Sequence, residues 1–228
     1  MQCSPTPKAG QGEMLVSGKI EGLRKGTLYL QKFVDTLLTS IDSVNIDGMP
    51  QFAFTTPIES PELYYLSLTK DDGDSLKDRI PFFGEPGSIT INTRLKTFET
   101  SAQIKGSENQ NLYREYQSYI RKFNSQQLDY LEDYLEFQKD GLQKKSDSMQ
   151  KVLDNLIRRK YLYAINFASN NADHEIAPFI ALAEVYDANL SLLDTLAARM
   201  SSEVATSKYG KKLTEYLSDR RADEQPED

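Results

Sequence analysis

Four short stretches in the first half of the chain decide its fold: Val16-Ser-Gly-Lys-Ile-Glu-Gly-Leu23, Gly26-Thr-Leu-Tyr-Leu30, Ile41-Asp-Ser-Val-Asn-Ile46 and Ile80-Pro-Phe-Phe-Gly-Glu-Pro-Gly-Ser-Ile-Thr-Ile91. Apolar and polar side chains alternate in them, and glycine or proline stands beside the apolar runs, which is typical of short strands joined by turns. The pattern extends outward on both sides. It predicts about eight strands, at residues 14–20, 27–33, 40–46, 51–55, 63–68, 79–83, 88–92 and 98–104.

No long helical pattern lies between these strands. Because parallel neighbours usually need a helical crossover, we expect an antiparallel sandwich or a partly open barrel. Gly18, Gly22 and Gly26 recur along the first strands, but no Gly-Lys-Ser/Thr motif follows them, so they predict turns and not a phosphate loop. The adjacent pairs Tyr64-Tyr65 and Phe82-Phe83 should each place one ring in the core and the other outside it.

The second half of the chain has a different period. From residue 108 onward apolar side chains recur every three or four positions, as in amphipathic helices. The pattern predicts a long helix over 109–143, capped by Ser107, and a second over 147–168, which together make an antiparallel hairpin. Shorter helices are expected at 173–186, 190–200 and 208–218. The fold class is therefore α+β.

The same patterns predict the domain organisation. We expect a flexible tether at 1–13, a β-rich domain at 14–106, a helical region at 107–218 and a disordered tail at 219–228. The chain has 39% hydrophobic residues, which is enough to bury a core. Its net charge is −7 with both signs interspersed, which argues against a nucleic-acid-binding surface. No apolar run approaches the length of a membrane span.

Residues that could carry chemistry are few. A thioredoxin-type enzyme needs a Cys-x-x-Cys motif, and Cys3 is the single cysteine. His174 is the single histidine, and its neighbours Asp173 and Glu175 cannot share a helix face with it, so we expect a side chain at a helix start and not a metal ligand. We predict no catalytic residue, no metal and no cofactor. A carboxylate-dependent hydrolase stays open, because the 34 acidic side chains offer many pairs.

The four opening stretches, taken in order, resemble the small β-rich domain of unknown function that precedes a thioredoxin-like domain in many envelope proteins of Bacteroidetes. Gly106-Ser-Glu-Asn-Gln-Asn-Leu-Tyr113, Ala181-Leu-Ala-Glu-Val-Tyr186 and Ser207-Lys-Tyr-Gly-Lys-Lys-Leu213 are similar to stretches of the helical segment that follows it. The resemblance covers about residues 14–217. The sequence stops about where the thioredoxin-like domain would begin. The resemblance therefore implies a location and an architecture, and no activity.

Cys3 precedes a short polar stretch, residues 4–12, that is rich in proline and glycine and should be an unstructured tether. The local sequence leaves two interpretations open, the lipidated cysteine of a bacterial envelope lipoprotein or a free thiol on a frayed end. Gln2 stands where a small residue is usual before a lipidated cysteine. The resemblance favours lipidation of Cys3 and a location in the cell envelope, facing the periplasm or on the outer membrane, with the signal peptide missing from the sequence as given.

The predicted function is a non-catalytic binding or scaffold role in the envelope. The alternative implied by the resemblance is an accessory module that docks a separate thioredoxin-like protein. Expected partners are such a protein or another envelope protein, with no nucleic acid and with a membrane only through the lipid anchor. The tyrosine-rich acidic segment 128–137 is either a partner surface or the solvated face of an amphipathic helix.

Overall fold

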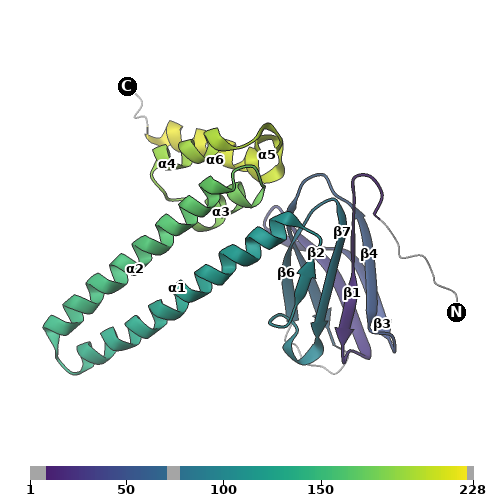
Figure 1. The fold of residues 1–228 in the computed structure, drawn as a ribbon, viewed down its shortest axis with the longest axis horizontal. Coiled ribbons are helices and arrows are strands. Elements are labelled where there is room, and N and C mark those ends of the chain that lie inside the picture. The colour runs from purple at the N-terminus through teal and green to yellow at the C-terminus, as the bar shows by residue number, and fades with distance from the viewer. Residues whose placement is uncertain (1–8, 71–77, 225–228) are drawn as a thin grey trace. The chain divides into compact units, whose positions relative to one another are not determined.

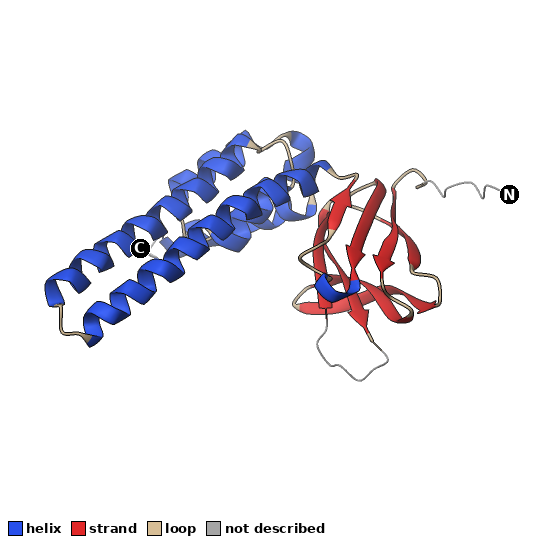
Figure 2. Ribbon diagram, turned by 60° about the horizontal axis from the view of Figure 1, so that its bottom comes forward, coloured by secondary structure: helices blue, strands red, loops and turns tan. Residues whose placement is uncertain are grey.

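The computed structural model describes residues 9–70 and 78–224. The chain divides into two compact units, Met1–Asn111 and Leu112–Asp228. Figure 2 shows the first unit built from strands, apart from a short 3₁₀ turn and the start of one helix, and the second built from helices. This segregation of strands and helices along the chain confirms the α+β class.

The first unit is a sandwich of two four-stranded sheets. One sheet has the strand order β4-β1-β7-β8 and the other has the order β3-β2-β5-β6, and the two are not closed into a barrel. The strands are β1 (Glu13–Glu21), β2 (Lys25–Val34), β3 (Leu37–Asp47), β4 (Gln51–Pro57), β5 (Glu62–Thr69), β6 (Asp78–Gly84), β7 (Gly87–Arg94) and β8 (Gln103–Lys105). Of the two expected arrangements, the sandwich is the one found.

One strand pair contradicts the antiparallel expectation. β1 and β7 are parallel neighbours, with Val16 opposite Ile89 and Gly18 opposite Ile91. Figure 1 shows β7 lying beside β1. Between β1 and β7 the chain passes through β2 and β3 of the other sheet, returns to the first sheet as β4, and then passes through β5 and β6 of the other sheet. The crossover between the two parallel strands is therefore made by the opposite sheet, so no helix is required.

The inward side chains of both sheets form one apolar cluster. Tyr64 and Phe82, which pair across β5 and β6, belong to it, and their rings stack with centroids 5.9 Å apart. Their neighbours Tyr65 and Phe83 lie outside this cluster. The Tyr65 ring packs on the outer face against Phe33, at 5.7 Å between centroids. The expected division is found for Tyr64 and Tyr65, whereas Phe83 is 0% exposed and is therefore buried, although it lies outside this cluster.

Gly18 does not form a turn, contrary to the expectation from its spacing. It lies in the middle of β1, between Phe52 of β4 and Ile91 of β7. A Cβ atom at this position would stand 1.8 Å from the carbonyl oxygen of Ile91. The residue is glycine because the backbones of β1 and β7 approach too closely for any side chain. Gly22, with φ of +89°, follows the end of β1 and does form a turn.

The eighth strand is much shorter than residues 98–104. A 3₁₀ turn covers Leu95–Thr97, and only Gln103–Lys105 pairs with β7. Hydroxyl groups hold the intervening backbone: Thr93 Oγ1 donates to the Phe98 carbonyl at 2.6 Å, and Ser101 Oγ donates to the Thr97 carbonyl at 2.7 Å. Such local hydrogen bonds compete with a strand ladder.

The helices begin with α1, Glu108–Lys139. The Ser107 hydroxyl accepts a hydrogen bond from the backbone N–H of Gln110 at 2.9 Å, which confirms the expected N-cap. The others are α2 (Gln143–Asn170), α3 (Ile176–Glu184), α4 (Leu190–Arg199), α5 (Ser202–Thr206) and α6 (Lys208–Glu224). The hairpin of α1 and α2 is found, with its turn at Gly141 (φ +70°) instead of residues 144–146.

Helix α6 continues to Glu224, past residue 218, where a charged tail was expected to begin. Arginine side chains of this segment are bound to the body of the second unit. Arg220 Nη1 donates to the carbonyl oxygens of Tyr186 and Ala188, at 3.1 and 2.8 Å, and Arg221 pairs with Asp194. These contacts order a sequence whose composition alone predicts disorder.

Candidate functional site

The residues singled out from the sequence do not assemble into a reactive centre in the part of the chain that the structure describes. Cys3 lies outside those residues. His174 Nδ1 lies 2.9 Å from Asp173 Oδ1 in the turn before α3, and this hydrogen bond lowers the pKa of Asp173. Across residues 9–70 and 78–224, no three His, Cys, Asp or Glu side chains gather as a metal-binding group. Within the same residues, no helix combines the length and apolarity needed to cross a bilayer.

An aromatic cluster joins α1 to α2 inside the second unit. Tyr163 of α2 lies at its centre and contacts the rings of Tyr119, Phe123 and Phe167, with centroids 5.1, 5.9 and 6.0 Å away. Tyr116 of α1 stacks on Tyr163 at 6.1 Å and contacts Phe167 at 5.3 Å. Such ring pairs add to the stabilisation from burial alone and fix the ring orientations.

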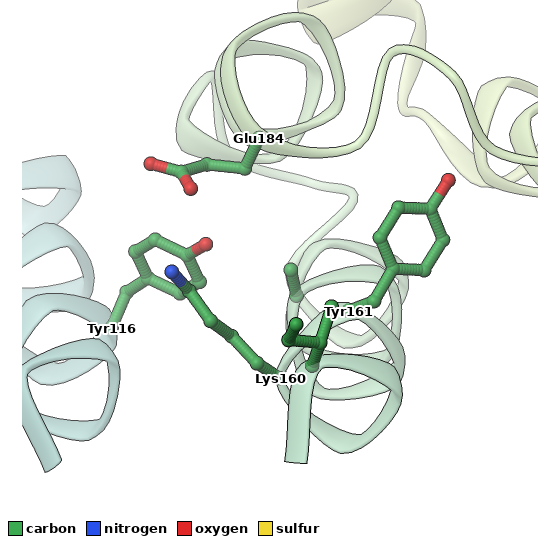
Figure 3. A pocket seen from close by; sticks show the side chains of 6 residues that line it. Tyr116, Lys160, Tyr161 and Glu184 are labelled. Atoms are coloured by element: carbon green, nitrogen blue, oxygen red, sulfur yellow. The ribbon is translucent and has the colours of Figure 1, made fainter. Parts of the chain in front are cut away.

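A cavity of about 170 Å³ opens beside this cluster. Its lining comes from α1, α2 and the last residue of α3: Tyr116, Ile157, Lys160, Tyr161, Ala164 and Glu184. Figure 3 shows Lys160 and Glu184 extending toward Tyr116, whereas the hydroxyl of Tyr161 points away from it. We call this the Tyr116 cavity.

The hydroxyl group of Tyr116 is the unusual feature of the cavity. The residue is 1% exposed, and its oxygen has no hydrogen-bond partner among the described residues. An unpaired buried hydroxyl costs about 1–3 kcal/mol, so such groups are rare in folded proteins and call for an explanation. Burial, reinforced by the negative charge of Glu184, raises the pKa of Tyr116, so the hydroxyl keeps its proton and acts as a donor.

The other polar side chains of the cavity differ in the hydrogen-bond partners that they already have. Lys160 Nζ donates to Asn124 Oδ1 at 2.8 Å, which uses one of its three protons. Glu184 is exposed and forms no ion pair with Lys160 in the described part of the chain. The Tyr161 hydroxyl donates to Asp187 Oδ1 at 3.2 Å, so it contributes a ring wall and no free donor. The cavity thus combines one buried donor, one cation and one anion.

A second candidate site is the far part of the hairpin, residues 128–139 of α1 and 143–152 of α2, which we call the arm. Figure 1 shows this end of the hairpin projecting beyond α3–α6. Leu128, Leu131 and Leu135 follow one another at helical spacing on α1, and they are 68, 40 and 54% exposed. This leucine stripe is the kind of surface that binds another protein.

The arm also has an open groove lined by both apolar and basic side chains. The groove has a volume of about 380 Å³, and its apolar lining comes from Phe137, Met149 and Val152. Lys144 and Lys145 also line it, and the Lys145 ammonium lies 5.4 Å from the centre of the Phe137 ring. We call it the basic groove.

The two helices of the arm carry opposite charge. Residues 128–139 contain four acidic and one basic side chain, and residues 143–152 contain three basic and one acidic. Among the described residues, none of these acids on α1 forms an ion pair with a base on α2. The charges therefore face solvent and are available to another molecule.

Only one of the two sites was visible from the sequence. The tyrosine-rich, acidic composition of segment 128–137 makes it a possible partner surface, and an amphipathic helix with a solvated acidic face is the alternative. The Tyr116 cavity was not found, since Tyr116 fits the apolar stripe of α1 and reads as an ordinary core residue. Glu184 is 68 positions away along the chain, so no local pattern connects the two.

Residues 14–113 match the family model of a domain of unknown function, DUF4369. Among the described residues, the matched region contains the strands β1 to β8, apart from Glu13, and the first turn of α1. It confirms the part of the resemblance that concerns a β-rich domain of unknown function. The match carries no link to thioredoxin-like proteins or to Bacteroidetes, and those parts stay predictions. A comparison with curated proteins found no match.

Proposed function

We propose that this protein has a non-catalytic binding role and that its arm associates with the arm of a second copy of the same chain. The observation that carries the proposal is the exposed leucine stripe of α1 on a helix pair with opposite, unpaired charges. Exposed leucines in a row are unfavourable in water, and burying each of them against an apolar surface contributes about 1.5–3 kcal/mol.

A second copy offers the surface that the leucine stripe requires. The stripe is flanked by Asp129, Glu132 and Glu136, whereas the basic groove is lined by apolar side chains together with two lysines. Placing the stripe of one copy on the groove of another therefore buries apolar area and brings acidic side chains toward Lys144 and Lys145. Pairing two copies of α1 instead would juxtapose like charges, which opposes association.

Sedimentation velocity over a series of protein concentrations tests this association. The wild-type chain is expected to show a weight-average mass that rises above the 25.9 kDa of one copy. The double substitution Leu131→Asp/Leu135→Asp should return it to a monomer, because it places charge in the apolar contact. Leu192→Asp is the matched control, since Leu192 is an exposed leucine of α4 outside the arm. A monomer at every concentration would refute the proposal, and so would an equal effect of the control.

Charge reversal tests the electrostatic part separately. Lys144→Glu/Lys145→Glu should weaken self-association, and the further change Glu132→Lys/Glu136→Lys in the same chain should restore it. Added salt should weaken the wild-type complex, because screening shortens the range of charge attraction. If the fourfold variant stays as weak as the lysine variant, charge complementarity does not guide the contact.

The location in the cell is a separate part of the proposal. It is supported by Cys3, by the polar stretch that follows it and by the resemblance described above. A lipid on Cys3 would hold the protein at a membrane surface and leave the arm free to meet other copies. Mass spectrometry of the protein from its own cells, together with membrane fractionation, tests this. An unmodified Cys3 in the soluble fraction would contradict it.

A further inference from the structure

The Tyr116 cavity is lined by three polar groups that form no hydrogen bond or ion pair with one another among the described residues. A buried hydroxyl without a partner, a lysine ammonium and a glutamate carboxylate all face one space of about 170 Å³. We infer that this cavity binds a small amino acid in its zwitterionic form. Its carboxylate would accept hydrogen bonds from Tyr116 Oη and Lys160 Nζ, and its ammonium group would lie against the carboxylate of Glu184.

The Tyr116 hydroxyl has no acceptor among the described residues, which leaves it able to donate to a bound ligand. Its ring is stacked on Tyr163 and packed against Phe167, so the side chain cannot turn to reach another partner. The hydroxyl stays protonated, so its free hydrogen-bonding function is donation. A carboxylate is the acceptor that gains most from such a donor, and the nearby lysine adds charge assistance.

The opposite charges of Lys160 and Glu184 select a zwitterion over a simple acid or amine. The two side chains approach the cavity from α2 and from the end of α3, and they do not neutralise each other by an ion pair within the described residues. A carboxylate without an amino group would leave Glu184 repelling it, and an amine without a carboxylate would be repelled by Lys160.

The size and lining of the cavity limit the ligand further. Its volume is below the range of roughly 300–1,000 Å³ that accommodates drug-sized molecules. Ile157, Ala164 and the ring of Tyr161 give it an apolar wall. A small aliphatic side chain suits this wall, so L-alanine is the appropriate probe.

An NMR titration of the full chain with L-alanine tests the inference. Saturable shifts of amides near residues 116, 160 and 184 are expected. Propionate lacks only the amino group of L-alanine and ethylamine lacks only its carboxylate, so each should bind roughly tenfold or more weakly. No saturable shift with L-alanine would overturn the inference, and so would equal binding of the three probes.

Two tyrosine variants test whether the Tyr116 hydroxyl binds a ligand or is hydrogen-bonded within the protein. Tyr116→Phe should weaken L-alanine binding roughly tenfold. It should also raise the melting temperature of the ligand-free protein by about 2–4 °C, because it removes an unpaired buried group. Tyr216→Phe is the matched control, since this tyrosine of α6 is not among the residues that line the cavity and its hydroxyl donates to the Tyr186 carbonyl oxygen at 2.8 Å. It should leave binding unchanged. A lower melting temperature for Tyr116→Phe would show that the hydroxyl is satisfied within the protein and would overturn the inference.

Discussion

The carboxylate of Glu85, in the turn between β6 and β7, accepts a hydrogen bond from the backbone N–H of Glu108 at 2.7 Å. The same carboxylate lies 3.0 Å from the side-chain amide of Asn109, which donates to it. The first N–H groups of a helix have no partner within the helix, and the helix dipole favours a negative charge beside them. A turn of the sandwich thus caps α1 together with Ser107.

Replacing Glu85 tests the value of this contact. Glu85→Ala is expected to lower the free energy of unfolding by about 1–2 kcal/mol, because it removes both a cap and a charge at a helix N-terminus. Urea denaturation measures the change. Glu99→Ala removes an exposed carboxylate near the 3₁₀ turn and should change stability by less than about 0.5 kcal/mol. Equal losses in the two variants would show that Glu85 has no special role.

Two glycines are required for different reasons. At Gly18 another strand lies too close for a side chain, and at Gly48 the backbone conformation is unfavourable for other residues. Gly18→Ala should lower stability by about 3 kcal/mol or more, since its Cβ would meet the Ile91 carbonyl oxygen at 1.8 Å and force β1 and β7 apart. Gly48→Ala should cost only about 1–2 kcal/mol, because its φ of +86° is strained for alanine but nothing lies within 4 Å of the new atom. Thermal unfolding of both variants ranks the costs. A smaller loss at Gly18 than at Gly48 would contradict the observed strand spacing.

The ion pair between Lys32 and Glu62 is partly buried. The Lys32 ammonium lies 2.7 Å from Glu62 Oε1, and the glutamate side chain is 6% exposed while the lysine is 30% exposed. Lys32→Met keeps the apolar stem but leaves the carboxylate without this cation, so we expect a loss of about 2 kcal/mol, less than for a fully buried pair. The double variant Lys32→Met/Glu62→Gln should recover part of the loss in urea denaturation. If the double variant loses the sum of both single changes, the two residues are not coupled.

Alkaline pH should destabilise the second unit. Burial raises the pKa of Tyr163 to about 12, and the negative charge of Glu115 adds to the shift. An unfolded tyrosine loses its proton near its ordinary pKa of 10.0, so between pH 10 and 12 the folded chain binds more protons than the unfolded one. The stability contributed by this group is complete below pH 10 and is lost as the pH rises toward 12.

Urea denaturation at pH 9 and at pH 11 measures this dependence on either side of the ordinary pKa of 10.0. The free energy of unfolding should fall between the two values. Tyr163→Phe should reduce that fall, because it removes one group whose folded and unfolded pKa values differ. A variant with the same fall as the wild-type chain would exclude a contribution from Tyr163.

Much of the architecture follows from local pattern. Alternating side chains in 16–30 and glycine-rich turns predicted the strands, and the change to helical spacing after residue 107 predicted the hairpin. The Ser107 cap was also predictable, since serine is preferred just before a helix, where its hydroxyl accepts a hydrogen bond from a backbone N–H two or three residues further on. These features depend on residues within a few positions of one another, so the sequence is sufficient for them.

The order of strands and the candidate sites depend on distant residues. Gly18 was predicted to form a turn, because nothing near it in the sequence reveals that β7 lies alongside. The eighth strand was predicted to be longer, because the hydrogen bonds of the Thr93 and Ser101 hydroxyl groups cannot be recognised from a hydrophobic pattern. The leucine stripe could be seen from spacing alone, but its exposure could not.

The sequence by itself determined the class of fold and the place where strands give way to helices, because composition and periodicity act locally. Only the tertiary structure decided that β1 and β7 run parallel and that Tyr116, Lys160 and Glu184 share one cavity. The physical reason is that these relationships join segments far apart in the chain. Their juxtaposition is set by which faces bury the most apolar surface when the whole unit packs.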